Sequence, residues 1–321
     1  MSLAVASFDA PWAASLAPDS EVELPAGTYA GPWKLAPGVH LTAGPGAILK
    51  SGAGADATLT LAGDGRVEGL TIEVPPGGYG VRIGGGKAVL VGVHLKAGRA
   101  AKAAIYVGHG EVTITRAQIE GLVDYGVLAE EAQRLTVSDT SLRGRRAGVA
   151  AVSSPTVIDG CTFVGPFSEA AISLIHSPEA HLARNVLSSV KTMGIKLINS
   201  TATLSRNRVT GGRADAQGLE GNSLYADNSH LTLASDQLGD PGTAAQGPIV
   251  MLLHSTARLD GVLIQGALQS LIYVADGSAL TVSDSELRGA PVGLAVEEGS
   301  SASEAGFRFV SVTRHLMRLA Q

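Results

Sequence analysis

The sequence is poor in cysteine, in charge and in aromatic residues, and each shortage excludes something. Its only cysteine, Cys161, leaves no basis for a disulfide framework or a thiolate metal site. Charged residues make up 17 % and the formal net charge is −5, which argues against a nucleic-acid partner. Aromatic residues make up 4 %, which fits a narrow core of small apolar side chains. No apolar run reaches the roughly 18 residues that a membrane-spanning helix needs, so we expect no membrane span.

What the sequence does contain is a repeated hydrophobic pair whose two members are five residues apart. The pair returns every 21 to 29 residues along most of the chain. The first members are Val67, Leu90, Ile114, Val137, Ile158, Leu182, Leu204, Leu233, Leu259 and Val282, and the pair Phe307/Val312 extends the series. A period of this length is typical of a solenoid in which each repeat forms one coil.

Each repeat predicts three short strands. Between the two members of nearly every pair lies a residue that accepts a positive φ at low cost, which indicates a tight corner between two strands. A third apolar stretch with period-two alternation follows 12 to 16 residues after most first members. These features predict an all-β parallel β-helix of about 11 coils with three sheets. The expected corner residues are Gly69, Gly92, Asp139, Gly160, Asn185, Asn207, Asp236, Gly261 and Asp284, and the repeat at Ile114 lacks one.

Serine recurs at the end of six consecutive repeats, each time directly after a turn-type residue and before the next strand. We expect these serines to bond to neighbouring turn backbone, which is a structural role. They are Ser154, Ser177, Ser200, Ser229, Ser255 and Ser278.

The period is not interrupted by a linker, which predicts a single β-helix domain over residues 1–321. The open ends of a solenoid expose core and strand edges, so both ends need a cover. We expect an N-terminal cap over 1–20, coils over 21–312 and a C-terminal cap over 313–321, with 314–320 helical.

Two segments resemble a known superfamily. The sequence LPAGTY at 24–29, followed by PGVHLTAG at 37–44, resembles the first coil of the pectate-lyase-like superfamily of right-handed parallel β-helices. Ile198-Asn199-Ser200 and the segment SRNRV at 205–209 are similar to the repeats of its carbohydrate-binding and sugar-hydrolase branch. The resemblance implies a right-handed, single-stranded β-helix and is unspecific for activity. It also implies a secreted, periplasmic or cell-surface location. No signal peptide is visible, and cytoplasmic residence stays an alternative.

The outward side chains of the third strand form the most distinctive column. Coil by coil we expect Arg82, Tyr106, Leu128, Ala150, Ser173, Lys196, Tyr225, Met251, Tyr273 and Ala295. Tyr79 and Tyr125 immediately precede this strand, so five of the six tyrosines lie on one stripe. Tyrosine rings suit the flat faces of sugars. We therefore expect Tyr106, Lys196, Tyr225 and Tyr273 to bind a polysaccharide or a cell-surface glycan.

The longest loops flank the same strand and carry the remaining candidates. Lys191, Lys196 and Arg213 are candidates for a catalytic base or charge stabiliser. Asp215, Glu220 and Asp240 could bind Ca²⁺ through carboxylate oxygens, and no other cofactor is expected.

The function is less determined than the fold. The aspartate clusters of the superfamily's hydrolases are absent, so we favour a non-catalytic β-helix that displays a glycan-binding sheet. A polysaccharide lyase or glycoside hydrolase acting on an acidic polysaccharide is the first alternative, and a structural or adhesin-type surface protein is the second. The oligomeric state is not predicted.

Overall fold

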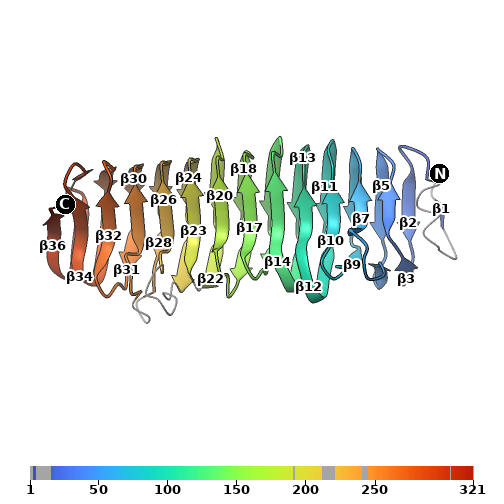
Figure 1. Ribbon diagram of the computed structural model, residues 1–321, viewed down its shortest axis with the longest axis horizontal. Coiled ribbons are helices and arrows are strands. Elements are labelled where there is room, and N and C mark those ends of the chain that lie inside the picture. Colours follow the sequence, from blue (N-terminus) through green and yellow to red (C-terminus); the bar gives the residue numbers. More distant parts are fainter. Residues whose placement is uncertain are drawn as a thin grey trace. The chain divides into compact units, whose positions relative to one another are not determined.

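The chain forms two compact units of parallel strands, Met1–Val157 and Ile158–Gln321 (Figure 1). The computed structural model describes residues 3–4, 16–190, 192–211, 221–240, 245–303 and 305–320, and these contain no helix. In each unit the strands of successive coils pair in register with their equivalents, which is a right-handed parallel β-helix. The predicted fold class is confirmed.

In each unit the first strands of the coils build a sheet, here called sheet A. In the first unit its strands are β1 (Leu3–Ala4), β2 (Glu21–Leu24), β5 (Val39–Ala43), β8 (Gly65–Glu68), β11 (Lys87–Val91), β13 (Glu111–Thr115) and β15 (Arg134–Ser138). In the second unit they are β21 (Ala180–Ala183), β24 (Thr201–Ser205), β27 (His230–Ala234), β30 (Thr256–Asp260), β33 (Ala279–Ser283) and β35 (Ser301–Ala302). Strand β18 (Thr156–Asp159) lies at the boundary of the units.

The second strands of the coils are short. In the first unit they are β3 (Gly27–Ala30), β6 (Ala47–Lys50), β9 (Thr71–Glu73) and β16 (Ser141–Leu142). In the second unit they are β19 (Thr162–Val164), β22 (Val186–Val190), β25 (Arg208–Gly211), β28 (Gln237–Leu238) and β31 (Leu263–Gln265).

The third strands carry the predicted binding column. In the first unit they are β4 (Trp33–Leu35), β7 (Ala57–Leu61), β10 (Tyr79–Ile83) and β17 (Ala147–Val152). In the second unit they are β20 (Ala170–Ile175), β23 (Met193–Ile198), β26 (Leu224–Asp227), β29 (Val250–Leu253) and β32 (Ser270–Ala275).

In four coils the second and third strands are one continuous strand, so the expected three sheets are not separate there. These strands are β12 (His94–Val107), β14 (Gln118–Glu130), β34 (Ser285–Glu297) and β36 (Phe307–Leu319). The pairing of β12 with β14 shifts register between Ala97 and Ala101, where the strand changes from the second to the third position.

The core of each coil is made by the repeated hydrophobic pair. Both members of every pair from Val67/Ile72 to Val282/Leu287 are buried, and most are completely inaccessible. Burying one such side chain contributes about 1.5–3 kcal/mol, so the pairs account for much of the stability of a coil. The pair Phe307/Val312 differs, because both residues are partly exposed in the last strand.

The corner prediction is right at six positions and wrong at three. The backbone is left-handed at Gly69, Gly92, Asp139, Gly160, Gly261 and Asp284, as expected. It is not left-handed at Asn185, Asn207 or Asp236. There the preceding residue takes the positive φ: Arg184, Arg206 and Ser235 respectively. The repeat at Ile114 also has a corner, at Arg116 with φ 52°.

Asn185, Asn207 and Asp236 are instead buried in a ladder of side-chain hydrogen bonds. The Nδ2 of Asn185 donates to the Oδ1 of Asn207 at 2.9 Å, and the Nδ2 of Asn207 donates to the Oδ1 of Asp236 at 2.9 Å. The same oxygens accept the backbone N–H groups of Asn185 and Asn207. Satisfying these buried N–H groups explains why the amides turn inward rather than forming the corner.

The serines form the ladder that was expected of them. All six are buried, and the Oγ atoms of Ser154, Ser200, Ser229, Ser255 and Ser278 each accept a backbone N–H of the preceding coil. Ser229 accepts from Ser200 at 3.1 Å, and Ser255 accepts from Ser229 at 3.0 Å. Ser229 and Ser255 also donate to the carbonyl two residues earlier. The residues before them, Asn228 and His254, have positive φ.

The expected helix over 314–320 is wrong. Residues 314–319 belong to β36, whose partners in β34 run from Ser285 to Glu297, and residue 320 follows the strand. Its apolar residues are spaced to continue the pairing of the preceding coil, and that long ladder outweighs local helix propensity.

Candidate ligand-binding faces of the third strands

The predicted column of outward residues exists in the second unit. Lys196 pairs with Tyr225, Tyr225 with Met251, and Met251 with Tyr273 on neighbouring strands. All four side chains are partly exposed, and the residues directly before and after each of them in its strand are buried. Strands in register lie about 4.8 Å apart, so Tyr225 and Tyr273 are about 10 Å apart.

A second outward column runs beside the first. It consists of Ile175, Ile198, Asp227 and Leu253, each paired with the next, and Leu253 pairs in turn with the buried Ala275. Ile198, Asp227 and Leu253 stand two residues after Lys196, Tyr225 and Met251, and the side chains of Ile198 and Leu253 are half-buried. The middle of the face therefore combines apolar side chains with the carboxylate of Asp227, which lies 3.1 Å from the Nδ1 of His254.

One end of this face is polar. The Nζ of Lys196 lies 3.7 Å from the Oε1 of Glu169, and the same oxygen accepts a hydrogen bond of 3.2 Å from the Oγ of Ser173. Ser173 is buried, and the side chains of Lys196 and Glu169 are 21 % and 23 % exposed. This partial burial makes the ion pair stronger than one on an open surface.

The other end holds a tyrosine–glutamate pair. The hydroxyl of Tyr273 donates to the Oε1 of Glu297. This hydrogen bond and partial burial raise the pKa of Tyr273 to about 12, so the phenol keeps its proton at neutral pH. The ring of Tyr273 is held by its hydroxyl, which orients it on the face.

Tyr106, the fourth predicted binding residue, lies in the first unit in a different setting. It pairs with Arg82 on one side and Leu128 on the other, and its hydroxyl donates to the Oε2 of Glu130 at 2.8 Å. That hydrogen bond raises the pKa of Tyr106 to about 12. Its ring centroid is 5.0 Å from that of Tyr79, with the planes tilted by 38°.

Cations lie over the tyrosine rings of the first unit. The Cζ of Arg82 is 5.7 Å from the centroid of the Tyr106 ring, and the Nζ of Lys102 is 5.4 Å from that of Tyr79. The Cζ of Arg146 is 5.1 Å from the centroid of the Tyr125 ring. These distances are within the range of favourable cation–π interaction.

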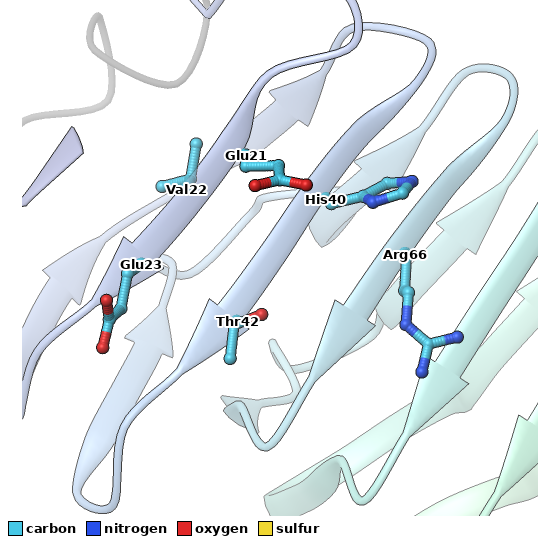
Figure 2. A pocket seen from close by; sticks show the side chains of 6 residues that line it. All are labelled: Glu21, Val22, Glu23, His40, Thr42 and Arg66. Atoms are coloured by element: carbon cyan, nitrogen blue, oxygen red, sulfur yellow. The ribbon is translucent and has the colours of Figure 1, made fainter. Parts of the chain in front are cut away.

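Sheet A of the first unit carries a shallow polar depression of about 420 Å³ (Figure 2). Its lining side chains come from β2, β5 and β8, where Glu21 pairs with His40 and His40 with Arg66. Arg66 is ion-paired with Glu68, and the lining of the depression includes no tyrosine, tryptophan or phenylalanine. The third strands are the stronger candidates, because they combine aromatic rings with charged ends.

Several predicted site residues lie outside the described residues: Lys191, Arg213, Asp215 and Glu220. The calcium site proposed for Asp215, Glu220 and Asp240 therefore stays a prediction, with only Asp240 described and half-buried. Among the residues that the structure describes, no three His, Cys, Asp or Glu side chains gather in a way that could hold a metal ion.

The acids that contact the column were not predicted as site residues. Glu130, Glu169 and Glu297 each bond to a side chain that is distant in sequence, namely Tyr106, Lys196 and Tyr273. Glu130 and Glu297 stand two residues after column positions Leu128 and Ala295, one coil beyond the tyrosine that they bind. That spacing was the available signal for them.

Solved structures share the fold at low identity. The periplasmic alginate epimerase AlgG is 12 % identical over 91 % of this chain and 78 % of its own, with a TM-score of 0.56. The A-module of the Azotobacter vinelandii mannuronan C-5 epimerase AlgE4 is 14 % identical over 94 % and 91 % of the two chains, with a TM-score of 0.55. Tailspike protein 3 of bacteriophage CBA120 is 14 % identical over 92 % of this chain and 56 % of its own, with a TM-score of 0.54.

A family model also matches. It is described as periplasmic copper-binding protein (NosD), and the match covers residues 66–233, just over half of the chain. No curated protein matches the chain. In the described residues no helix is long and apolar enough to span a membrane.

Proposed function

The chain belongs to the NosD family, and from that premise we propose that it is a periplasmic or secreted β-helix protein that binds a polysaccharide or cell-surface glycan without cleaving it. The binding face is the outward side of the third strands. The structural neighbours that act on alginate, and the phage tailspike, support a glycan as the ligand through their shared fold alone.

The observation that carries the proposal is the register of Lys196, Tyr225, Met251 and Tyr273. Two partly exposed rings about 10 Å apart, with Met251 between them, form a row along the direction in which the coils follow one another. A sugar has apolar C–H faces that pack on aromatic rings and hydroxyls that need polar partners. The rings offer the first, and the Lys196–Glu169 pair and Glu297 at the two ends offer the second.

Binding is favoured over cleavage by the placement of the acids. Glycoside hydrolysis uses two carboxyl groups about 5–10 Å apart across one bond. Glu169 and Glu297, the two acids that bond to residues of the column, lie five coils apart, about 24 Å at the spacing of paired strands. Asp227 stands between them, at least two coils or about 10 Å from either along the coils, and its carboxylate is 3.1 Å from the Nδ1 of His254. Lys196, the described candidate for a base, has its amine at an ion-pair distance from Glu169.

The binding face is tested by replacing both rings. Tyr225→Ala with Tyr273→Ala should weaken binding of the best ligand from a glycan array by about 1–3 kcal/mol, from lost ring contact and apolar area. Isothermal titration of the purified double variant measures this, with folding checked by circular dichroism. Thr232→Ala with Thr281→Ala, two exposed positions on sheet A of the same unit, is the matched control and should bind normally. Equal affinity in the tyrosine variant and the control would remove the proposed face.

The lack of turnover is a separate expectation. We expect no unsaturated product when the protein is incubated with uronate polysaccharides, with or without Ca²⁺, followed by the ultraviolet absorbance of the new double bond. Product that appears only with Ca²⁺ and is lost in Lys196→Ala or Asp215→Ala would make the protein a lyase.

Copper is not part of the proposal, although the family's description names it. Copper sites in proteins use several imidazole or sulfur ligands together. In the described part of the chain no such group of three exists, and the thiol of Cys161 is buried, 3.5 Å from the carbonyl oxygen of Asp159. The described residues do not fit a copper site.

A further inference from the structure

Three consecutive coils of the first unit each place a cation over a tyrosine ring. The pairs are Lys102 over Tyr79, Arg82 over Tyr106 and Arg146 over Tyr125. The strands β10, β12 and β14 that carry the rings are neighbours in register, since Tyr79 pairs with Ala103 and Ala103 with Tyr125. We call Arg82, Lys102 and Arg146 the cation strip.

A tyrosine ring whose face is covered by a cation cannot stack on a sugar with that face. The ring instead restrains the long lysine or arginine side chain that lies over it. A guanidinium that lies on a ring still directs its in-plane N–H groups away from the ring, where they can meet an anionic oxygen. Because the side chain is already ordered, binding costs less conformational entropy than it does for a free lysine or arginine.

The strip stands in a locally positive neighbourhood, although the chain as a whole is negative. Arg143 and Arg145 lie in the loop that leads to Arg146, and both are exposed. Among the acids near the strip, Asp56 pairs with Arg82, Asp124 pairs with Arg145, and Glu130 accepts a hydrogen bond from Tyr106. No carboxylate in the described part of the chain lies within ion-pair distance of Lys102.

We infer that the cation strip binds the anionic groups of an acidic polysaccharide, either uronate carboxylates or sulfate esters. The inference rests on the proposed glycan-binding function and names its ligand class. Lys102 and Arg146 directly precede Ala103 and Ala147, which both pair with Tyr125, so the two cations stand two coils apart, about 10 Å. This spacing suits a chain whose charges repeat along its length. The strip selects for charge, whereas Tyr225 and Tyr273 supply ring contact in the second unit.

The test removes two charges and keeps the length of the side chains. Lys102→Gln with Arg146→Gln is titrated with three probes: an oligogalacturonate, a sulfated galacto-oligosaccharide and a neutral galacto-oligosaccharide, each at low and at high salt. Lys87→Gln with Arg134→Gln is the matched control, because it removes the same charge from exposed positions on sheet A of the same unit. Circular dichroism and melting temperature confirm that both variants fold.

We expect about tenfold weaker binding of at least one anionic probe by the strip variant, a smaller dependence on salt, and unchanged binding of the neutral probe. Whichever anionic probe loses more affinity identifies carboxylate or sulfate as the natural group. Equal loss in the strip variant and the control would mean that only overall charge matters, and it would overturn the inference.

The inference and the proposed function fail in different ways. If the strip variant binds the anionic probes as well as the native protein does, while the Tyr225/Tyr273 double variant loses them, the strip is wrong and the proposed function stands. If the strip variant loses the anionic probes and the tyrosine variant does not, the strip stands and the proposed face in the second unit is wrong. If the native protein binds none of the probes, both are wrong.

Discussion

Replacing Leu233 by Asp should unfold the coil that contains it. Leu233 is completely buried in β27, where it pairs with Leu204 on one side and Leu259 on the other. An aspartate there would lose the apolar burial and place a charge among leucines, with no described cation beside it. Leaving a buried charge unpaired costs about 3–5 kcal/mol. For a unit of this size we expect the melting temperature to fall by roughly 10 °C or more.

The neighbouring residue offers a matched control for this variant. Thr232 is exposed on the outward side of the same strand, so Thr232→Asp adds the same charge without burying it. Its melting temperature should stay close to that of the native protein. Thermal unfolding followed by circular dichroism compares the two variants directly. Similar melting in Leu233→Asp and Thr232→Asp would mean that the inward and outward assignment is wrong.

The fold could be predicted because one physical requirement repeats. Every coil must bury two side chains on the two sides of a corner, so hydrophobic residues five apart recur with each coil. The same repeat predicted that Leu204, Leu259 and Val282 point inward and that Thr136 points outward, which the structure confirms. At the ends of the chain this repeated pattern does not continue, so it gives no prediction there. The strand β36 has only one neighbour in the described chain, and local propensity alone wrongly indicated a helix there.

The three wrongly predicted corners were assigned from residue type, and the spacing within the repeat would have placed them correctly. From Gly69 to Asp284, every left-handed corner between the two members of a pair lies two residues after the first member. Asn185, Asn207 and Asp236 lie three residues after it, as do the buried Thr140 and Ser285. Asparagine accepts a left-handed backbone, but at these positions its side-chain amide stabilises the fold by hydrogen bonding to buried backbone groups. The constant spacing was therefore the better guide.

The binding column was predictable from the sequence, and so was one of the two acids at its ends. Period-two alternation places Lys196, Tyr225 and Tyr273 outward, and the pairing of the strands confirms their register. Glu297 stands two residues after column position Ala295 in the neighbouring strand, and that spacing was the available signal for it. Glu169 lies before its strand, four residues ahead of Ser173, and no local pattern indicated its contact with Lys196.

The buried end of the amide ladder leads to the second large expected effect: replacing Asp236 by Asn should stabilise the protein at neutral pH. Asp236 is completely buried, and burial raises the pKa of its carboxyl from 3.8 to about 6, although the N–H groups of Asn207 and Ala234 partly oppose this. The shift of about 2 units corresponds to about 3 kcal/mol by which folding is weakened once the carboxyl is ionised.

The two preceding coils show that an amide fits this position. The Nδ2 of Asn185 donates to the carbonyl of Ile158, and the Nδ2 of Asn207 donates to that of Leu182. Leu204 pairs with Leu182 on the next strand, so its carbonyl is the equivalent acceptor for an amide at position 236. The oxygen of that amide can still accept the bonds from Asn207. The lost bond is the one from the backbone N–H of Ala234 at 3.1 Å, which costs about 1 kcal/mol.

The stability difference between Asp236→Asn and the native protein should depend on pH. Because the folded pKa is raised above the unfolded value, the carboxyl's contribution to stability is fully present below about pH 4 and is lost as the pH rises to about 6. The advantage of Asp236→Asn should therefore be small or negative at pH 4, grow between pH 4 and 6, and reach about 2 kcal/mol above that range. Denaturant unfolding at a series of pH values measures it. Asp260→Asn, an exposed carboxyl in the next coil, is the control and should show no such growth. A difference between Asp236→Asn and the native protein that stays constant from pH 4 to 7 would show that the buried carboxylate is accommodated by the ladder without cost.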